Sequence, residues 1–257
     1  MLSLYREQCR AELLARPFPC AWESWLAQNV HQFRLLGQAE KNRVRDDVQI
    51  LVAEKNWEGC NGLVVSDEIK VTIAGQACLL TIGLDVDCFA RLRSILVYPS
   101  AFLRVERFSS IPSRGVAVYR GPVILAWDCA LSEGRDPASE NNLTVHEFAH
   151  QLDFLDGGLN GTPLLSGDEK VQAWERVMTK AYVQQKRATR RGHKSFLGDY
   201  AAKDPCEFFA VCSERFYTQP QALHDFDADV YELLVDYYRV DPRIWYSGPH
   251  AAGAPVK

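Results

Sequence analysis

The sequence lacks the features that mark membrane, secreted and nucleic-acid-binding proteins. No apolar run approaches the roughly 18 residues that a membrane-spanning helix requires. Charges and prolines interrupt positions 1–33, where the apolar core of a signal peptide would lie. A formal net charge of −4 leaves no general basic field for nucleic acid. We therefore expect a cytoplasmic globular protein that binds neither membranes nor nucleic acid directly.

Cysteine pairs suited to redox chemistry or to a second metal site are also absent. None of the eight cysteines forms a CxxC pair, and most have apolar neighbours. In a reducing compartment such cysteines are small buried apolar side chains, so we expect no disulfides. The one basic cluster, 186–194, is interpreted as a solvated helix end and loop. With 257 residues, 47% of them hydrophobic, the chain can bury a full core.

Apolar periodicity divides the chain into helical and extended segments. Helical spacing covers 2–14, 21–36, 40–54 and 66–80, and again 168–187, 204–217 and 220–238. Two segments between these groups, 93–99 and 115–127, are rich in β-branched and aromatic residues and predict strands. Pro122 lacks an amide donor, so the pair Gly121-Pro122 should divide the second segment at a sheet edge or bulge.

His146-Glu147-Phe148-Ala149-His150 is the pattern with the clearest chemistry. On an α-helix, positions four apart differ by about 40° in rotation and about 6 Å in rise, so both imidazoles can reach one metal ion. Two histidines and a glutamate at this spacing predict a zinc-activated water with Glu147 as the general base. Capping side chains precede the motif at Ser139, Asn141 and Asn142. The alternative is an ordinary helix with two surface histidines.

Catalytic zinc needs a third protein ligand, and the spacing leaves more than one position open. Asp156 lies six residues after His150, as the third ligand does in HExxHxxGxxH enzymes. The turn in those enzymes uses a glycine where this chain has Asp153. Glu207 and Glu214 lie seven residues apart on a later predicted helix and so share nearly one face. Glu207 could instead complete a capping box with Asp204.

Two further features could serve a peptide-cleaving site. Tyr200, seven residues before Glu207, could offer its phenol to a developing oxyanion, or it could be an ordinary loop residue. An edge strand just before the zinc helix could take up an extended peptide through main-chain hydrogen bonds, or it could bind nothing.

Several segments together resemble the Mlc titration factor A family of zinc peptidases. They are HEFAHQLD at 146–153, YAAKDPCEFFAVCSE at 200–214, the pair Tyr98-Pro99 and GPVILAW at 121–127. The resemblance covers most of 90–240, and it is less distinct over the first 60 residues. The family is similar to the catalytic domain of anthrax lethal factor in the layout of its zinc site.

The resemblance implies a fold, a ligand set and an activity. The fold would be α+β and zincin-like, of the gluzincin type, mostly helical with a small mixed sheet whose edge strand borders the active site. It would comprise a helical region at 1–60, a catalytic domain at 61–245 and a flexible tail at 246–257. His146, His150 and Glu207 would bind one zinc ion per chain. Glu147 would be the general base, and Tyr200 would stabilise the tetrahedral intermediate.

The resemblance also implies a substrate class and a partner. Family members are described as cytosolic peptidases of aminopeptidase type that bind the glucose repressor Mlc and so modulate the glucose phosphotransferase system. Some carry an extra histidine that can occupy the zinc, whereas this chain has none between His31 and His146. Cys206 and Cys212 depart from the enterobacterial pattern and bear on the identity of the partner. Two other interpretations remain: a repressor-binding regulator with a structural zinc, and a zinc hydrolase of non-peptide acyl substrates.

Overall fold

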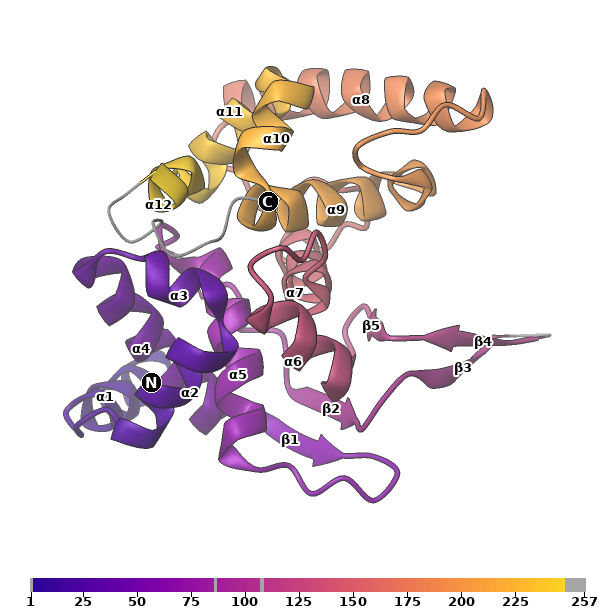
Figure 1. The fold of residues 1–257 in the computed structure, drawn as a ribbon. Helices are drawn as coiled ribbons and strands as arrows, with labels where there is room; N and C mark the ends of the chain where they lie inside the picture. Colours follow the sequence, from indigo (N-terminus) through magenta and orange to yellow (C-terminus); the bar gives the residue numbers. More distant parts are fainter. Residues whose placement is uncertain (1, 86, 107–108, 248–257) are drawn as a thin grey trace.

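The computed structural model describes residues 2–85, 87–106 and 109–247 (Figure 1). Its N-terminal part is helical: α1 (Leu2–Leu14), α2 (Cys20–Asn29), α3 (His31–Leu35), α4 (Gln38–Glu54) and α5 (Asp67–Ala77), which a 3-10 turn (Cys78–Thr81) extends. Ser66 caps α5, within the helix predicted at 66–80, by accepting a hydrogen bond from Ile69 N. The helix predicted at 21–36 is divided in two, because the backbone is extended at Val30.

A four-stranded mixed sheet follows, with the order β1-β2-β6-β5. The strands β1 (Asn56–Gly59), β2 (Ser94–Tyr98) and β6 (Val123–Ala126) are parallel, and β5 (Gly115–Ala117) pairs antiparallel with β6 at the end of the sheet. The segment predicted at 115–127 is divided at Gly121-Pro122, because these residues lie in the turn between β5 and β6. A hairpin, β3 (Phe102–Glu106) and β4 (Ser109–Ser113), projects between β2 and β5 (Figure 1).

The C-terminal half returns to helices: α6 (Trp127–Arg135), α7 (Leu143–Asp153), α8 (Asp168–Arg190), a 3-10 turn (Asp199–Ala202), α9 (Pro205–Thr218), α10 (Pro220–Phe226), α11 (Ala228–Tyr238) and α12 (Pro242–Ser247). The helix predicted at 220–238 is two helices, because Asp227 is extended and its side chain caps α11. Of the predicted tail, positions 246 and 247 belong to α12 and positions 248–257 lie outside the described residues.

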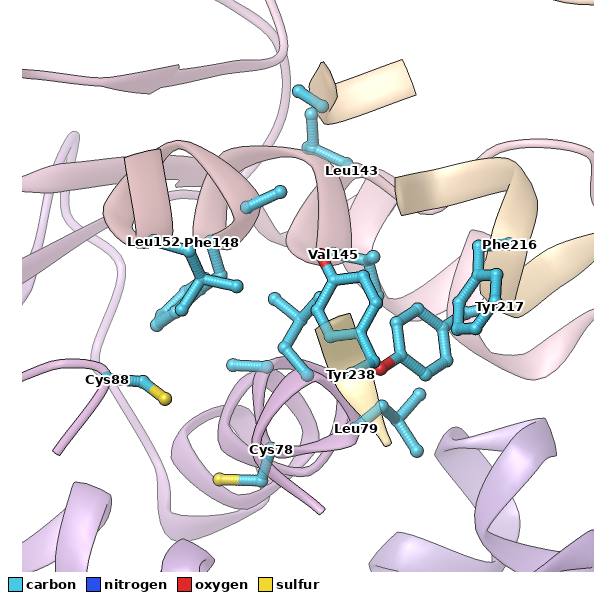
Figure 2. Packing of buried hydrophobic residues seen from close by; sticks show 14 of the residues in the cluster. Cys78, Leu79, Cys88, Leu143, Val145, Phe148, Leu152, Phe216, Tyr217 and Tyr238 are labelled. Carbon is cyan, nitrogen blue, oxygen red and sulfur yellow. The ribbon is translucent and has the colours of Figure 1, made fainter. Parts of the chain in front are cut away.

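The core holds α7 between the N-terminal helices and α9. Figure 2 shows Val145, Phe148 and Leu152 pointing from α7 toward Cys78 and Leu79 in the 3-10 turn that extends α5. All three α7 side chains are fully buried. Burying a side chain of this size stabilises a fold by about 1.5 to 3 kcal/mol. This contact fixes the rotation of α7 about its own axis and therefore the direction of its other face.

An aromatic cluster holds α9 in turn against α11. Phe216 stacks on Tyr238 with ring centroids 5.4 Å apart, and the Tyr238 hydroxyl donates to Ser213 Oγ at 2.8 Å. The predicted fold class is confirmed: a mostly helical α+β protein with a small mixed sheet. Among the described residues, the helices are all too short or too polar to cross a membrane.

Candidate metal centre and catalytic cleft

The helix α7 carries both histidines of the sequence motif. It begins after Asn142, whose side chain accepts a hydrogen bond from Val145 N at 3.0 Å. Because one side of α7 is fixed in the core, His146, Glu147 and His150 come to lie along the cleft that the helix borders. Both imidazoles are 8% exposed, so they are not the surface histidines of an ordinary helix.

Glu207 reaches the same point from α9. The Asp204 side chain accepts from Glu207 N at 2.9 Å and Pro205 occupies the first turn, so the helix begins as the sequence predicts. The Glu207 carboxylate turns away from this cap. Its Oε2 lies 3.1 Å from His146 Nε2 and 3.3 Å from His150 Nε2. The Glu207 carboxylate therefore does not form the capping box that was the alternative interpretation.

These three side chains have the geometry of a metal-binding set. Their donor atoms all lie within 4.8 Å of one another. Tetrahedral zinc with bonds of about 2.0 to 2.1 Å has ligand atoms about 3.3 Å apart, close to the two nitrogen–oxygen distances here. Both imidazoles present Nε2, so one ion could contact all three groups. Three protein donors would leave one position of the tetrahedron open for a small molecule.

The carboxylate of the cluster has the charge of a metal ligand, whereas the raised pKa of His146 means that this imidazole would lose a proton on binding a metal. Burial opposes ionisation of Glu207, but hydrogen bonds from His146 and His150 outweigh it and hold the pKa of Glu207 well below its usual range. Burial alone would lower the pKa of His146, yet hydrogen bonds to Glu207 and Glu214 raise it to about 10. The carboxylate is thus ionised at neutral pH, as a metal ligand must be.

Glu214 lies behind the first histidine. Its Oε2 is 3.3 Å from His146 Nδ1, and its Oε1 accepts from Asn142 N at 2.6 Å. Glu214 is buried and lies about two helical turns after Glu207 on α9. The residue therefore orients the imidazole and leaves Nε2 free to face the centre, a role that carboxylates often have behind metal-ligating histidines.

Asp156 lies outside the cluster. Its Oδ1 accepts from Gly158 N at 2.6 Å on an exposed loop. Asp153, at the position where a glycine would be expected, is fully buried, and burial raises its pKa. It accepts from Thr162 N at 3.0 Å and from the Cys206 thiol. These bonds join the loop after α7 to the start of α9.

Glu147 lies between the centre and the edge strand. Burial raises the pKa of its carboxyl, against the opposing pull of His146 and His150, and the Ala117 amide donates to it. The strand β5 approaches it closely: a Cβ on Gly115 would come within 2.5 Å of Glu147 Oε1 and 2.7 Å of a Leu143 methyl group. The predicted edge strand thus borders the site, and glycine is needed there for space.

Gly115→Ala is accordingly expected to destabilise the fold by about 1 to 3 kcal/mol, because the new methyl group has to displace Glu147 or Leu143. Urea denaturation monitored by circular dichroism would measure the change. Gly37→Ala is the matched control, since its Cβ would meet only Glu40 at 3.4 Å, and its effect should stay within about 1 kcal/mol. Equal stabilities of the two variants would show that β5 tolerates a side chain here.

Tyr200 and Lys203 hold the other oxygen of Glu207. The Tyr200 hydroxyl donates to Glu207 Oε1 at 2.7 Å, and Lys203 Nζ donates to it at 2.6 Å. Tyr200 is 51% exposed, so its phenol borders open space. Burial, then the contact with Glu207, raises the pKa of Tyr200 to about 12, so the phenol keeps its proton. The sequence reasoning missed Lys203, although its four-residue spacing from Glu207 was a signal for an ion pair.

The cleft extends on both sides of the centre. One cavity of about 410 Å³ includes Arg114 and Glu133, and a second of about 380 Å³ includes Phe154 and Leu159. The two cavities share four of their lining residues: Gly115, His146, Glu147 and Tyr200. A chain-like ligand can therefore pass over the centre rather than end at it. The cavity walls could not be predicted from sequence patterns, because they come from distant segments.

Comparison with known proteins agrees with this geometry. Residues 4–239 match the family of glucose-regulated metallo-peptidases M90. The chain belongs to this family. An uncharacterized protein from Synechocystis sp. is 31% identical over 91% of this chain and 88% of its own length. Mlc titration factor A of Yersinia pestis is 28% identical over 91% of this chain and 87% of its own length. The resemblance predicted from the sequence is confirmed.

A solved structure from Bacteroides caccae, a candidate zinc-binding metallo-peptidase, also matches. The match covers 82% of this chain and 91% of the Bacteroides chain. The sequence identity is 13% and the TM-score is 0.32. An M90 metallo-peptidase requires a metal. Among the described residues, one group of three histidine, cysteine or acidic side chains has donor atoms that converge. It consists of His146, His150 and Glu207.

Proposed function

We propose that this protein is a cytoplasmic zinc-dependent peptidase, with one zinc ion per chain held by His146, His150 and Glu207. The proposal rests mainly on one observation: the three donor atoms converge within 4.8 Å in a cleft that Glu147 and the edge strand β5 also line. A zinc ion bound there would supply Lewis-acid activation of water and of the scissile carbonyl. Membership of the M90 metallo-peptidases supports the reaction class.

Glu147 would act as the general base. It would accept a proton from the attacking water while the water oxygen bonds to the carbonyl carbon, and it would return that proton to the leaving nitrogen as the C–N bond breaks. Its environment supports this role in two ways. Burial raises the pKa of the carboxyl, which brings it nearer to neutral pH. The Ala117 amide fixes its position beside the cleft.

The substrate peptide would lie along β5, the terminal strand of the sheet. An exposed edge offers main-chain groups to an extended chain independently of its side chains. The cavities on both sides of the centre give such a chain room on each side of the scissile bond. The aminopeptidase type rests on the resemblance to the Mlc titration factor A family alone.

Tyr200→Phe should lower kcat by roughly ten- to a thousandfold, the range for losing one donor to a developing oxyanion. Its hydroxyl is 2.7 Å from the proposed ligand Glu207 and borders open space, so it can turn to a reacting oxygen. Zinc content should be unchanged, since the phenol is not a ligand. Steady-state kinetics on a fluorogenic peptide, with metal analysis of the same sample, would measure both. An unchanged kcat would leave Tyr200 only the role of holding Glu207.

A second function is favoured by a relative. The relative from Yersinia pestis is named Mlc titration factor A, and this name describes a protein that titrates Mlc. We therefore propose that this chain also binds a glucose-repressor-type transcription factor similar to Mlc. A regulator that used zinc only to hold its fold would have no need of Glu147, so the two functions can be separated experimentally.

A further inference from the structure

A cavity of about 650 Å³ lies outside the catalytic cleft, where β2 begins and the turn between β5 and β6 closes. Three arginines line it: Arg91 and Arg93 from the segment before β2, and Arg120 from the turn. We call it the arginine basin. Leu96 and Pro122 add apolar surface to its wall. The basin thus combines positive charge with apolar contact in a concave surface.

The three guanidinium groups have no carboxylate partner among the described residues. Arg91 donates through Nη1 to the main-chain oxygen of Phe154 at 2.7 Å, and the Arg120 guanidinium lies 5.2 Å from the centre of the Tyr119 ring. Glu58 is the one acidic residue lining the basin, and no ion pair connects it to any of the three within the described part of the chain. In a chain of net charge −4, this concentration of positive charge is local.

The backbone holds one of the arginines in an unfavourable conformation. Arg120 has a φ of +56°, in the left-handed region that favours glycine. The turn is closed around it by hydrogen bonds from Val118 N to Pro122 O and from Gly121 N to Val118 O. A long charged side chain held at such a position is an observation that favours a functional role over a purely structural one.

The sheet beside the basin is buried on one face only. In β2, Ile95 and Val97 are fully buried, whereas Ser94 and Leu96 are partly exposed. Leu96 is aligned with Ile124 of β6, which is also partly exposed. A strip of apolar surface therefore continues from the basin across the sheet. An oxyanion as small as phosphate would leave this strip and most of the cavity unused.

We propose that the arginine basin binds an acidic segment of a partner polypeptide, one in which several aspartates or glutamates alternate with apolar residues. Guanidinium groups match carboxylates in geometry and form charge-assisted hydrogen bonds with them. Two of the arginines come from the segment before β2 and the third from the turn between β5 and β6, so together they suit several carboxylates along a chain. The apolar strip suits the side chains between them. This site needs neither the metal nor Glu147.

A synthetic peptide of alternating glutamate and leucine with blocked ends tests this by calorimetry. The wild type should bind it, and Arg93→Gln/Arg120→Gln should weaken the binding at least about tenfold. Arg91 is left in place because it supports Phe154. Arg187→Gln/Arg190→Gln removes the same charge from the exposed end of α8 and should bind as the wild type does. Thermal melting of both variants checks that each is folded.

Four results would overturn the proposal, the last of them loss of binding on zinc removal. The first is no binding by the wild type. The second is an equal loss in both double variants, which would indicate attraction to net charge alone. The third is inorganic phosphate binding as tightly as the peptide with the same dependence on Arg93 and Arg120, which would make the basin a site for small oxyanions. Binding should also be the same after zinc is removed with a chelator, and loss on zinc removal would place the peptide in the catalytic cleft instead.

Discussion

Glu207→Gln is expected to lower zinc affinity by more than about a hundredfold and to abolish peptide cleavage. A neutral amide replaces the ionised oxygen on which both Nε2 atoms converge. Even residues behind a ligand contribute about 10- to 100-fold to metal affinity, so removal of a ligand should cost more. Competition with a zinc-sensitive fluorescent chelator would measure the affinity.

Asp156→Asn is the matched control for that experiment. It makes the same chemical change at the other position considered for the third ligand, and Asp156 lies on an exposed loop bonded to Gly158. Its zinc affinity and activity should stay near those of the wild type. If Asp156→Asn lost zinc while Glu207→Gln kept it, the third ligand would have to be reassigned, and the proximity of Glu207 to the histidines would be an ion-pair network only.

Glu147→Gln should reduce kcat by about 10² to 10⁴-fold while zinc content and fold stay as in the wild type. The amide keeps the shape of the side chain but cannot take the proton of water. Kinetics and metal analysis on one preparation would give both values. Glu214→Gln is a useful comparison, because it should weaken zinc binding through His146, whereas Glu147→Gln should not.

The same Glu147→Gln variant separates the enzyme from the regulator. If the repressor binds on a surface apart from the cleft, calorimetry should give the variant and the wild type equal affinity for it. Full residual activity in Glu147→Gln would contradict the mechanism. A wild-type protein that holds zinc and binds a repressor but cleaves no peptide would favour the regulator over the peptidase.

Local signals were sufficient for the helices that carry the site. Asn142 and Asp204 are caps that can be recognised from the sequence, so the starts of α7 and α9 were predictable. Apolar periodicity over long segments was less reliable. It predicted one helix for α2 and α3 and one for α10 and α11, because it does not detect the extended residues Val30 and Asp227. The break at Asp227 coincides with a capping side chain, a local signal that apolar spacing does not include.

The site itself could be predicted only in part. The spacing within α7 is fixed by the helix, so His146 and His150 were evident from the motif. The choice among Asp156, Glu207 and Glu214 depends on how α9 packs on α7 across 50 or more intervening residues, which periodicity does not encode. The resemblance supplied Glu207, and the structure places it beside the two histidines. The roles of Glu214, Asp153 and Lys203 follow from that packing and were found only in the structure.

Zinc titration of the metal-stripped protein, followed by cleavage of a peptide library, tests the central claim most directly. We expect no cleavage before zinc is added and a rise in cleavage that reaches its plateau at about one equivalent of zinc, as one three-ligand site requires. Cleavage only at the first bond of peptides with a free amino end would show that the peptidase is of the aminopeptidase type. Cleavage without metal, a plateau at two equivalents, or a zinc-loaded protein that cleaves nothing would contradict a single-zinc peptidase.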